Sequence, residues 1–309
     1  MVNYGAISLI HPSPLRYPGG KKKLANFITQ AIIENNIQGG TYIEPFAGGA
    51  SVALQLLFME HVNNIIINDI DKSIYSFWYS VLHKTDELCE LISDTPITIE
   101  EWKKQKTIQI NKEKTDELIL GFSTFFLNRT NRSGIITGGA IGGREQTGKW
   151  KIDVRFNKDD LIKRIRKIAL YTSRIQLYNK DAIDFINNIR SQLNDRTLIY
   201  FDPPYYTQGA SLYANHYTHV DHETLSRFIQ ELKCKWILTY DYTHKIIEMY
   251  PNVERRLLIL GYTVAKKVKS LEMIAFCDNF IIPEGKYSSV LIEPEHMLTG
   301  VTYAVKNVY

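Results

Sequence analysis

The sequence predicts an α/β fold: a doubly wound parallel sheet with helices on both faces, into which a second, mostly helical domain is inserted. Short apolar runs alternate with helix-like segments along most of the chain, which is typical of parallel strands joined by helices. Between residues 77 and 160 this alternation stops. The 309 residues, 44% of them hydrophobic, are enough for one large domain that carries an insertion.

The first expected unit is a strand at residues 41–43, followed by Gly48 and Gly49 and an apolar helix at 52–57. The next strand, at 65–67, ends at Asn68 and Asp69. Beyond the interruption we expect strands at 175–178, 197–201 and 236–240, helices at 182–192, 223–232 and 244–250, and further strands at 257–260, 264–268 and 289–292.

The interruption is interpreted as an inserted domain at residues 78–160, and residues 1–77 and 161–309 as the main domain. Helix-like stretches come first, and a segment rich in glycine and basic residues follows, where we expect a β-hairpin. Residues 100–170 hold 16 Lys and Arg against 9 Asp and Glu, whereas the rest of the chain is slightly acidic. The lysines up to Lys114 alternate with acids and fit a solvated helical face. The later cations (Arg129, Arg132, Arg144, Lys149, Lys151 and Arg155) are more typical of a surface that faces phosphates.

The composition disfavours several classes of protein. No run approaches the roughly 18 apolar residues of a membrane span, and residues 1–14 lack the pattern of a signal peptide. We therefore expect a soluble, cytoplasmic protein without a membrane partner. The cysteines Cys89, Cys234 and Cys277 lie far apart and form no C-x-x-C pair, which argues against a disulfide framework or a zinc site.

Three histidines, His216, His219 and His222, are spaced by three residues and raise the question of a metal. The sequence between them is loop-like, Asp221 is a plausible N-cap for the next helix, and no acid or cysteine completes a usual ligand set. We expect no metal site.

The most informative motif is Asp202-Pro203-Pro204-Tyr205, which directly follows the apolar run at 197–201. One interpretation is a turn that ends the strand, because proline stops strands and holds the preceding residue extended. The other is a grip on an amino group, because a carboxylate and the carbonyl of the rigid Pro203 are two acceptors. Tyr205 would then offer a face for a flat ring. The two interpretations are compatible.

A glycine-containing loop, Phe46-Ala47-Gly48-Gly49-Ala50, lies between an expected strand and a helix, where backbone donors can meet a ligand. An ordinary strand-to-helix turn would look the same. Asp69, at the end of the next strand, occupies the place where doubly wound nucleotide sites put an acid on ribose hydroxyls. Together they indicate a cofactor that contains a nucleoside.

Two further positions have both a structural and a functional interpretation. Asp181 follows the strand at 175–178 and is either a helix cap or a second ligand-binding carboxylate at the same sheet edge. The segment 16–23 resembles a phosphate-binding loop, but a P-loop would need glycine at Leu15 and Ser or Thr at Lys22, which excludes that class. It is either a surface turn or a loop that binds a carboxylate or phosphate.

These motifs, in this order and spacing, resemble the Dam-type adenine-specific DNA methyltransferases that use S-adenosylmethionine. The resemblance runs through 15–24, 43–52, 68–71, 126–135, Asp181 and 202–205. It implies a Rossmann-like methyltransferase sheet, a catalytic and cofactor-binding main domain, and an insertion that recognises the target. The implied cofactor residues are Tyr17, Lys21, Phe46, Ala47, Gly48, Gly49, Asp69 and Asp181; the implied target grip is Asp202, Pro203, Pro204 and Tyr205; and the implied DNA contacts are Arg16, Asn128, Arg129, Asn131 and Arg132, to which the basic segment adds Arg144, Lys149 and Lys151.

The chain departs from the family at two places. Ala50 stands where relatives often have glycine, and the neighbours of Arg129 differ enough that no relative's target sequence can be transferred. We expect a site-specific enzyme that methylates the exocyclic amino group of adenine in duplex DNA by base flipping, acts as a monomer, and leaves room for a cognate restriction endonuclease. Two alternatives remain open: a methyltransferase for RNA or a protein amide, and a DNA-binding regulator without catalysis.

Overall fold

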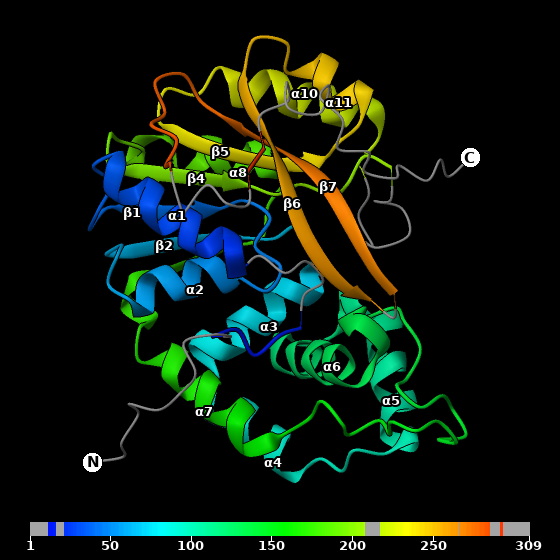
Figure 1. Ribbon diagram of the computed structural model, residues 1–309. Coiled ribbons are helices and arrows are strands. Elements are labelled where there is room, and N and C mark those ends of the chain that lie inside the picture. Colours follow the sequence, from blue (N-terminus) through cyan, green and yellow to red (C-terminus); the bar gives the residue numbers. More distant parts are fainter. Residues whose placement is uncertain (1–11, 17–21, 208–216, 265, 285–290, 293–309) are drawn as a thin grey trace.

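The computed structural model describes residues 12–16, 22–207, 217–264, 266–284 and 291–292, and its centre is a sheet of eight strands (Figure 1). The strands lie in the order β3-β2-β1-β4-β5-β7-β6-β8. Their bounds are β1 (Thr41–Glu44), β2 (Asn64–Asn68), β3 (Ile175–Tyr178), β4 (Thr197–Phe201), β5 (Lys235–Asp241), β6 (Glu254–Val264), β7 (Lys266–Phe276) and β8 (Leu291–Ile292). The first five pair in parallel and the last three join them in antiparallel fashion. The predicted α/β sheet is confirmed.

Helices cover both faces of this sheet, because alternate strand residues point into two separate cores. Leu198 and Tyr200 of β4 pack into the core under α1, α2 and α3, whereas Ile199 and Phe201 pack under α8, α10 and α11. All five residues of β4 are buried, as expected of a central parallel strand. The bounds of these helices are α1 (Lys22–Glu34), α2 (Ser51–Phe58), α3 (Lys72–His83), α8 (Ala182–Asn188), α10 (His219–Gln230) and α11 (His244–Met249).

The strand order reverses beside β1. From β1 the chain builds outward through β2 to β3, and it then returns to add β4 on the other side of β1. In an open parallel sheet, ligands bind at the carboxyl ends of the strands where the order reverses. The fold therefore places the predicted ligand edge at the loops that follow β1 and β4.

The end of the described chain differs from the prediction. We expected separate strands at 257–260 and 264–268, but β6 and β7 form one long hairpin in which Gly261 pairs with Lys269 inside the ladder. The strand predicted at 264–268 falls on two strands, since β6 ends at Val264 and β7 begins at Lys266. Glycine weakens strands, but the long antiparallel pairing of β6 with β7 accommodates Gly261.

The start of α10 also lies earlier than expected. Thr218, and not Asp221, is the N-cap: its side chain accepts a hydrogen bond from the backbone N–H of Asp221. The Asp221 carboxylate in turn accepts from the backbone N–H of Thr218 at 2.7 Å, which completes a capping box. Asp221 is therefore the third residue of α10 and not the N-cap that the sequence predicted.

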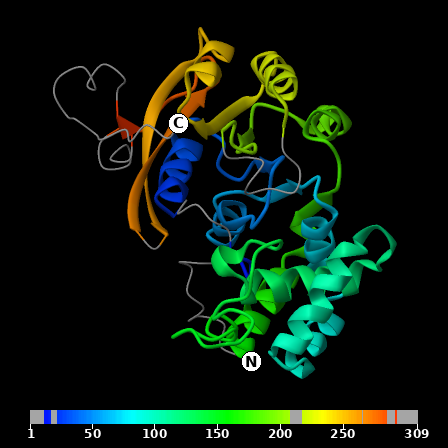
Figure 2. The ribbon, with the colours of Figure 1, turned by 90° about the vertical axis from the view of Figure 1, so that its right-hand side faces the viewer.

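The interval between β2 and β3 is helical, as predicted, and its helices gather at one end of the molecule (Figures 1 and 2). After α3 they are α4 (Thr85–Asp94), α5 (Ile99–Ile110), α6 (Glu117–Thr130) and α7 (Lys158–Ala169), with short 3₁₀ turns at η2 (Lys112–Lys114), η3 (Arg132–Gly134) and η4 (Thr172–Arg174). A further 3₁₀ turn, η5 (Arg190–Gln192), follows α8. The boundary proposed at residues 77 and 78 falls inside α3, whose Trp78 donates to the carbonyl of Gly48 at 2.9 Å. The division into two domains therefore stays a prediction.

The β-hairpin expected in the insertion is reduced to one antiparallel bridge, between Asn131 and Ala140. Glycines offer no side chains for cross-strand packing, and the Asn131 amide donates to the carbonyls of Ile135 and Ile136, which curls the chain into η3 instead. Among the described helices, none combines the length and apolarity needed to cross a membrane.

Helices α3 and α6 are in close contact. The rings of Phe77 and Phe125 stack in parallel with centroids 5.9 Å apart. Gly121 permits the approach: a Cβ there would lie 2.4 Å from the carbonyl oxygen of Ser76 and 2.3 Å from the Oγ of Ser80. Glycine in a helix interior is thus required by packing.

We expect Gly121→Ala to destabilise the protein by about 1–3 kcal/mol through overpacking, although alanine favours a helix by about 1 kcal/mol over glycine. Urea unfolding measures the difference. Gly139→Ala is the matched control, because a Cβ at Gly139 meets no atom within 4 Å. A Gly121→Ala protein more stable than wild type would contradict the close helix contact.

Candidate active site

Two residues of the loop after β1 have a left-handed backbone conformation. Gly48 has a φ of 46° and Ala50, the N-cap of α2, has a φ of 45°, so both are left-handed. The backbone N–H of Gly48 donates to Oδ2 of Asp69 at 2.9 Å. Glycine adopts a left-handed conformation without strain, which gives a physical reason for the preference at position 50 that this chain does not follow.

Asp69 sits at the end of β2 beside this loop. Its carboxylate accepts two backbone hydrogen bonds, from Gly48 and from Asp71, each at 2.9 Å. Those bonds favour the ionised form, but burial outweighs them and raises the pKa of Asp69 to about 7. A carboxylate that titrates near neutrality marks a partly dehydrated site.

Asn68 is a residue of this edge to which sequence reasoning gave no role. Its buried side-chain amide donates to the carbonyls of Pro45 and Lys180 at 2.9 and 3.0 Å and accepts from the N–H of Lys180 at 3.0 Å. One side chain thereby fixes the loops that follow β1 and β3. Its only sequence signal was its place at the end of an apolar strand.

Asp181 is the N-cap of α8, since its carboxylate accepts from the N–H of Ile183 at 2.9 Å. The structural and functional interpretations stay compatible, because the same carboxylate also bonds the hydroxyl of Tyr217. Burial, together with the charge of Asp181, raises the pKa of Tyr217 well above its usual value. The Tyr217 ring meets Phe46 edge-on, with centroids 5.9 Å apart.

Tyr217 was not predicted, and it brings the chain that follows β4 against the residues of the β1 and β3 loops. Phe46, Ala47, Gly48, Gly49, Asp69 and Asp181 therefore gather at one edge of the sheet. Tyr17 and Lys21 lie outside the described residues, so their predicted place beside the cofactor stays a prediction.

The motif after β4 lies next to this group, because β4 pairs with β1. Asp202 is half-buried, and its Oδ1 accepts from the hydroxyl of Thr239 at 2.8 Å. The Tyr200 hydroxyl lies 2.7 Å from the same Thr239 oxygen. Pro203 is buried, and Pro204 and Tyr205 are half-buried. The motif thus ends a strand and presents polar groups at the sheet edge.

Both described histidines of the spaced set have other partners. His219 lies 3.0 Å from the Tyr206 hydroxyl and 3.1 Å from a carboxylate oxygen of Glu223. His222 is buried against the Tyr240 hydroxyl at 2.6 Å, and burial lowers its pKa. His216 is outside the described residues, and within them no three His, Cys, Asp or Glu side chains are grouped to hold a metal.

The structure assigns different surroundings to the predicted DNA contacts. Asn128 and Asn131 are buried. Asn128 donates to the carbonyls of Arg16 and Gly134, and Asn131 accepts from the indole N–H of Trp102 at 2.7 Å. Both side chains hold neighbouring backbone in place, and their predicted contact with DNA stays a prediction.

Arg16 and Arg129 are half-buried beside them. A guanidinium nitrogen of Arg16 donates to the carbonyl of Asn131 at 3.1 Å, and Nε of Arg129 donates to the carbonyl of Arg155 at 2.9 Å. Burial, with the charges of Arg16 and Arg164, lowers the pKa of Arg129 to about 9. Both arginines carry a structural bond in addition to any role toward DNA.

The later basic residues are exposed, as a phosphate-facing surface requires. Arg132, Arg144, Lys149 and Lys151 all lie at the surface of the insertion. The Lys149 ammonium is 5.4 Å from the ring centroid of Trp150, which is itself 60% exposed. Cations beside an exposed aromatic ring are typical of surfaces that bind nucleic acids.

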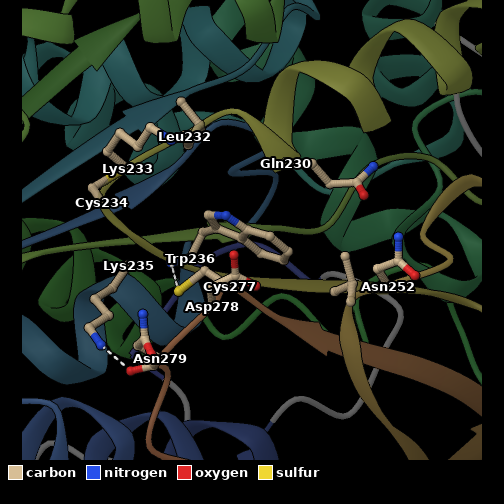
Figure 3. A pocket seen from close by; sticks show the side chains of 11 residues that line it. Gln230, Leu232, Lys233, Cys234, Lys235, Trp236, Asn252, Cys277, Asp278 and Asn279 are labelled. Atoms are coloured by element: carbon tan, nitrogen blue, oxygen red, sulfur yellow. Dashed lines mark hydrogen bonds between the residues drawn. The ribbon is translucent and has the colours of Figure 1, made fainter.

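A separate pocket of about 450 Å³ lies at the start of β5, away from the Asp202 motif (Figure 3). It is lined by Lys233, Lys235, Trp236 and Asp278 among others, and Cys234 and Cys277 border it. None of the predicted site residues lines it. Asp202 bonds Thr239, which lies toward the other end of β5. The candidate site is therefore an open sheet edge and not this pocket.

Comparison with known proteins agrees with the geometry. The family model of the D12 class N6 adenine-specific DNA methyltransferases matches residues 17–263. A protein of Methanocaldococcus jannaschii named Type II methyltransferase M.MjaIII is 26% identical over 204 residues, which cover 62% of this chain and 68% of that protein. The family match takes in the loops after β1, β2 and β4 and the whole insertion, so this chain belongs to the D12 class N6 adenine-specific DNA methyltransferases.

Proposed function

We propose that this enzyme moves a methyl group from S-adenosylmethionine to the exocyclic amino group of adenine at a specific site in duplex DNA, with the target base rotated out of the helix. One observation carries the proposal: Asp202-Pro203-Pro204-Tyr205 extends from β4 directly beside the left-handed glycine loop of β1. A target grip and a cofactor loop on neighbouring parallel strands can bring acceptor and donor together.

The residues at this edge fit S-adenosylmethionine. Asp69 accepts two backbone hydrogen bonds and keeps further lone pairs for ribose hydroxyls, Phe46 and Tyr217 supply aromatic surface for an adenine ring, and the carboxylates of Asp69, Asp181 and Asp202 suit a cationic ligand. When bound, the cofactor supplies a methyl carbon already activated by its sulfonium. Tyr17, Lys21, Ala47, Gly48 and Gly49 complete the proposed cofactor set.

The protein's task is to prepare the acceptor. The lone pair of an adenine amine is delocalised into the ring, so hydrogen bonds that its N–H groups donate to the Asp202 carboxylate and the Pro203 carbonyl increase electron density on the nitrogen and fix its direction. The rigid prolines limit the freedom of these acceptors. Asp202 is already restrained by Thr239 before any base arrives.

Base flipping is needed because in the duplex the adenine base is stacked and its amino group is paired. Rotation of a nucleotide out of the helix costs a few kcal/mol, and stacking on an aromatic ring offsets part of this cost. Tyr205 supplies that ring next to the acceptors. Both steps rest on the same four residues, Asp202 to Tyr205.

The insertion, taken as residues 78–160, is proposed to recognise the DNA. Arg132 is the exposed first residue of η3 and suits contact with base edges, whereas Arg144, Lys149 and Lys151 suit phosphates. Duplex DNA is favoured over RNA or a protein amide because these exposed cations gather in the segment between α6 and α7. The intact Asp202 motif argues against a regulator without catalysis.

Three finer points complete the proposal. The relative from M. jannaschii is named a Type II methyltransferase, which supports a role in restriction and modification with a cognate endonuclease. We propose a monomer, because one chain carries both the grip and the basic surface. Its place of action is the DNA of the cytoplasm.

Asp202→Ala is expected to abolish methyl incorporation into DNA while the dissociation constant of the cofactor changes little, because Asp202 faces the target amine. Labelled methyl transfer and calorimetry measure the two effects, and Asp195→Ala, at an exposed position, is the control. Turnover above about a tenth of wild type would remove Asp202 from this role.

Asp69→Ala should weaken cofactor binding by roughly 10- to 100-fold, the equivalent of a lost charge-assisted hydrogen bond of about 1.5–3 kcal/mol. Because the pKa of Asp69 is about 7, the cofactor should bind more tightly as the pH rises from about 6 to 8 and the carboxylate ionises. Asp69→Asn should remove this pH dependence. Calorimetry at several pH values tests both, with Asp86→Asn as the exposed control.

The same shift has a consequence for stability without ligand. The folded pKa is raised, so between about pH 4 and 7 the folded state binds the Asp69 proton more tightly than the unfolded state does. The contribution of this group to the free energy of unfolding therefore falls as the pH rises through that window. An Asp69→Asn protein whose stability depends on pH as wild type does would contradict the raised pKa.

Arg132→Ala should relax the choice of base at one position, because arginine discriminates guanine by about 1–3 kcal/mol. Lys149→Ala should instead weaken binding to all sequences and lower the salt dependence by about one unit of slope. Sequencing of modified bases in cells and salt titrations of binding measure these effects, with Lys245→Ala on α11 as control. An unchanged motif in Arg132→Ala would exclude that residue as a reader.

A further inference from the structure

Strands β5 and β7 place three polar residues on one face of the sheet, beside the Asp202 motif. Thr239 and Asp241 are two residues apart on β5, and Asp241 pairs with Glu272 of β7. Side chains of alternate residues point to the same face of a strand. On this face Ile237 of β5 and Ile274 and Phe276 of β7 pack into the core beneath α1. All three polar side chains therefore face the side on which Tyr200 and Asp202 lie.

Each of the three binds a different part of the segment from Asp202 to Thr207. Thr239 donates to Asp202 at 2.8 Å, and Glu272 accepts from the hydroxyl of Tyr205 at 2.5 Å. Asp241 accepts from the backbone N–H of Tyr206 at 2.8 Å and from the N–H and hydroxyl of Thr207 at 3.0 and 2.6 Å. The contacts are distributed over the whole segment.

We propose that Thr239, Asp241 and Glu272 form a clamp that holds the target grip in its working geometry, with Glu272 as the positioning residue for the Tyr205 ring. This inference rests on the proposed function. Glu272 lies beyond residues 17–263, so the family match does not include it. The antiparallel β7 strand brings it to the site.

The physical basis is the freedom that each group would otherwise have. A tyrosine ring turns about its χ angles, and a hydrogen bond from its hydroxyl to the fully buried Glu272 fixes the plane on which a base would stack. A carboxylate likewise rotates unless one oxygen is held, as Oδ1 of Asp202 is by Thr239. Small misplacements of reacting groups lower turnover strongly.

A purely structural role for the hydrogen bond between Tyr205 and Glu272 predicts different effects on activity. Glu272 would then affect the stability of the sheet, and its loss would reduce activity only as far as it reduces folded protein. A clamp instead predicts a loss of turnover in folded protein with unchanged cofactor affinity. It also predicts that removing either end of the bond has the same effect.

The test is a double-mutant cycle on the full chain, measured with a labelled methyl donor and unmethylated genomic DNA. Tyr205→Phe removes one end of the bond and Glu272→Leu the other, and each should lower turnover by about 10- to 100-fold. Cofactor affinity by calorimetry should change by less than about threefold. The double variant should be no worse than the more severe single one.

Conservative variants make the test specific. Glu272→Gln keeps an acceptor, so its turnover should stay within about threefold of wild type. Thr239→Ser keeps the hydroxyl and should be active, whereas Thr239→Val should not. Glu231→Gln, exposed at the end of α10, is the control. If Glu272→Leu fails to fold, Tyr205→Phe and Glu272→Gln still decide the outcome, because each changes few atoms.

Two results would overturn the clamp: wild-type turnover in Tyr205→Phe, or effects of Tyr205→Phe and Glu272→Leu that multiply. Wild-type protein that places no label in DNA would overturn the proposed function, and the clamp with it. Labelled DNA from wild type together with an unaffected Tyr205→Phe would overturn the clamp alone. The two failures are thus distinguishable.

Discussion

The parallel pairing of β1 with β4 is the constraint on which the site depends. Ile43 pairs with Ile199, so the two strands end at the same edge and release their loops side by side. The chain reaches β4 only after it has built β2, the insertion and β3. The glycine loop and the Asp202 motif, far apart in sequence, become neighbours because of this one register.

Around that edge the structure separates charge. Asp69, Asp181 and Asp202 follow strands at this edge, Asp241 ends β5, and Glu272 pairs with Asp241 from within β7. Burial raises the pKa of Asp69 to about 7. The exposed cations of residues 132–151 lie on the insertion. Under the proposed function, a cationic cofactor and an amine suit the first region and a polyanion suits the second.

The same physics decides which polar residues remain available to a ligand. Asn128 and Asn131 resemble readers of DNA, yet the glycine-rich turn after α6 exposes backbone carbonyls that would be buried without partners. Both amides donate hydrogen bonds to those carbonyls. The guanidinium groups of Arg16 and Arg129 likewise bond backbone carbonyls, those of Asn131 and Arg155.

Local pattern was sufficient for much of this protein. Apolar runs located β1 to β5 to within a few residues, because a strand buried on both faces is apolar throughout, and the broken rhythm located the helical insertion. Strand ends identified Asp69, Asp181 and Asp202 at one edge, since parallel strands must end together. By itself, then, the sequence determined the fold class and the family resemblance, and it predicted the ligand edge.

Only the tertiary structure decided the contacts that join distant segments. The pairing of β7 with β5 sets Glu272 against Tyr205, and the packing of the chain after β4 brings Tyr217 to Phe46 and Asp181. Neither has a local signature, because a buried glutamate and a loop tyrosine have the same appearance in any sequence. Their roles arise from which strand lies beside which, and that depends on the free energy of packing the whole sheet and not on any short stretch of it.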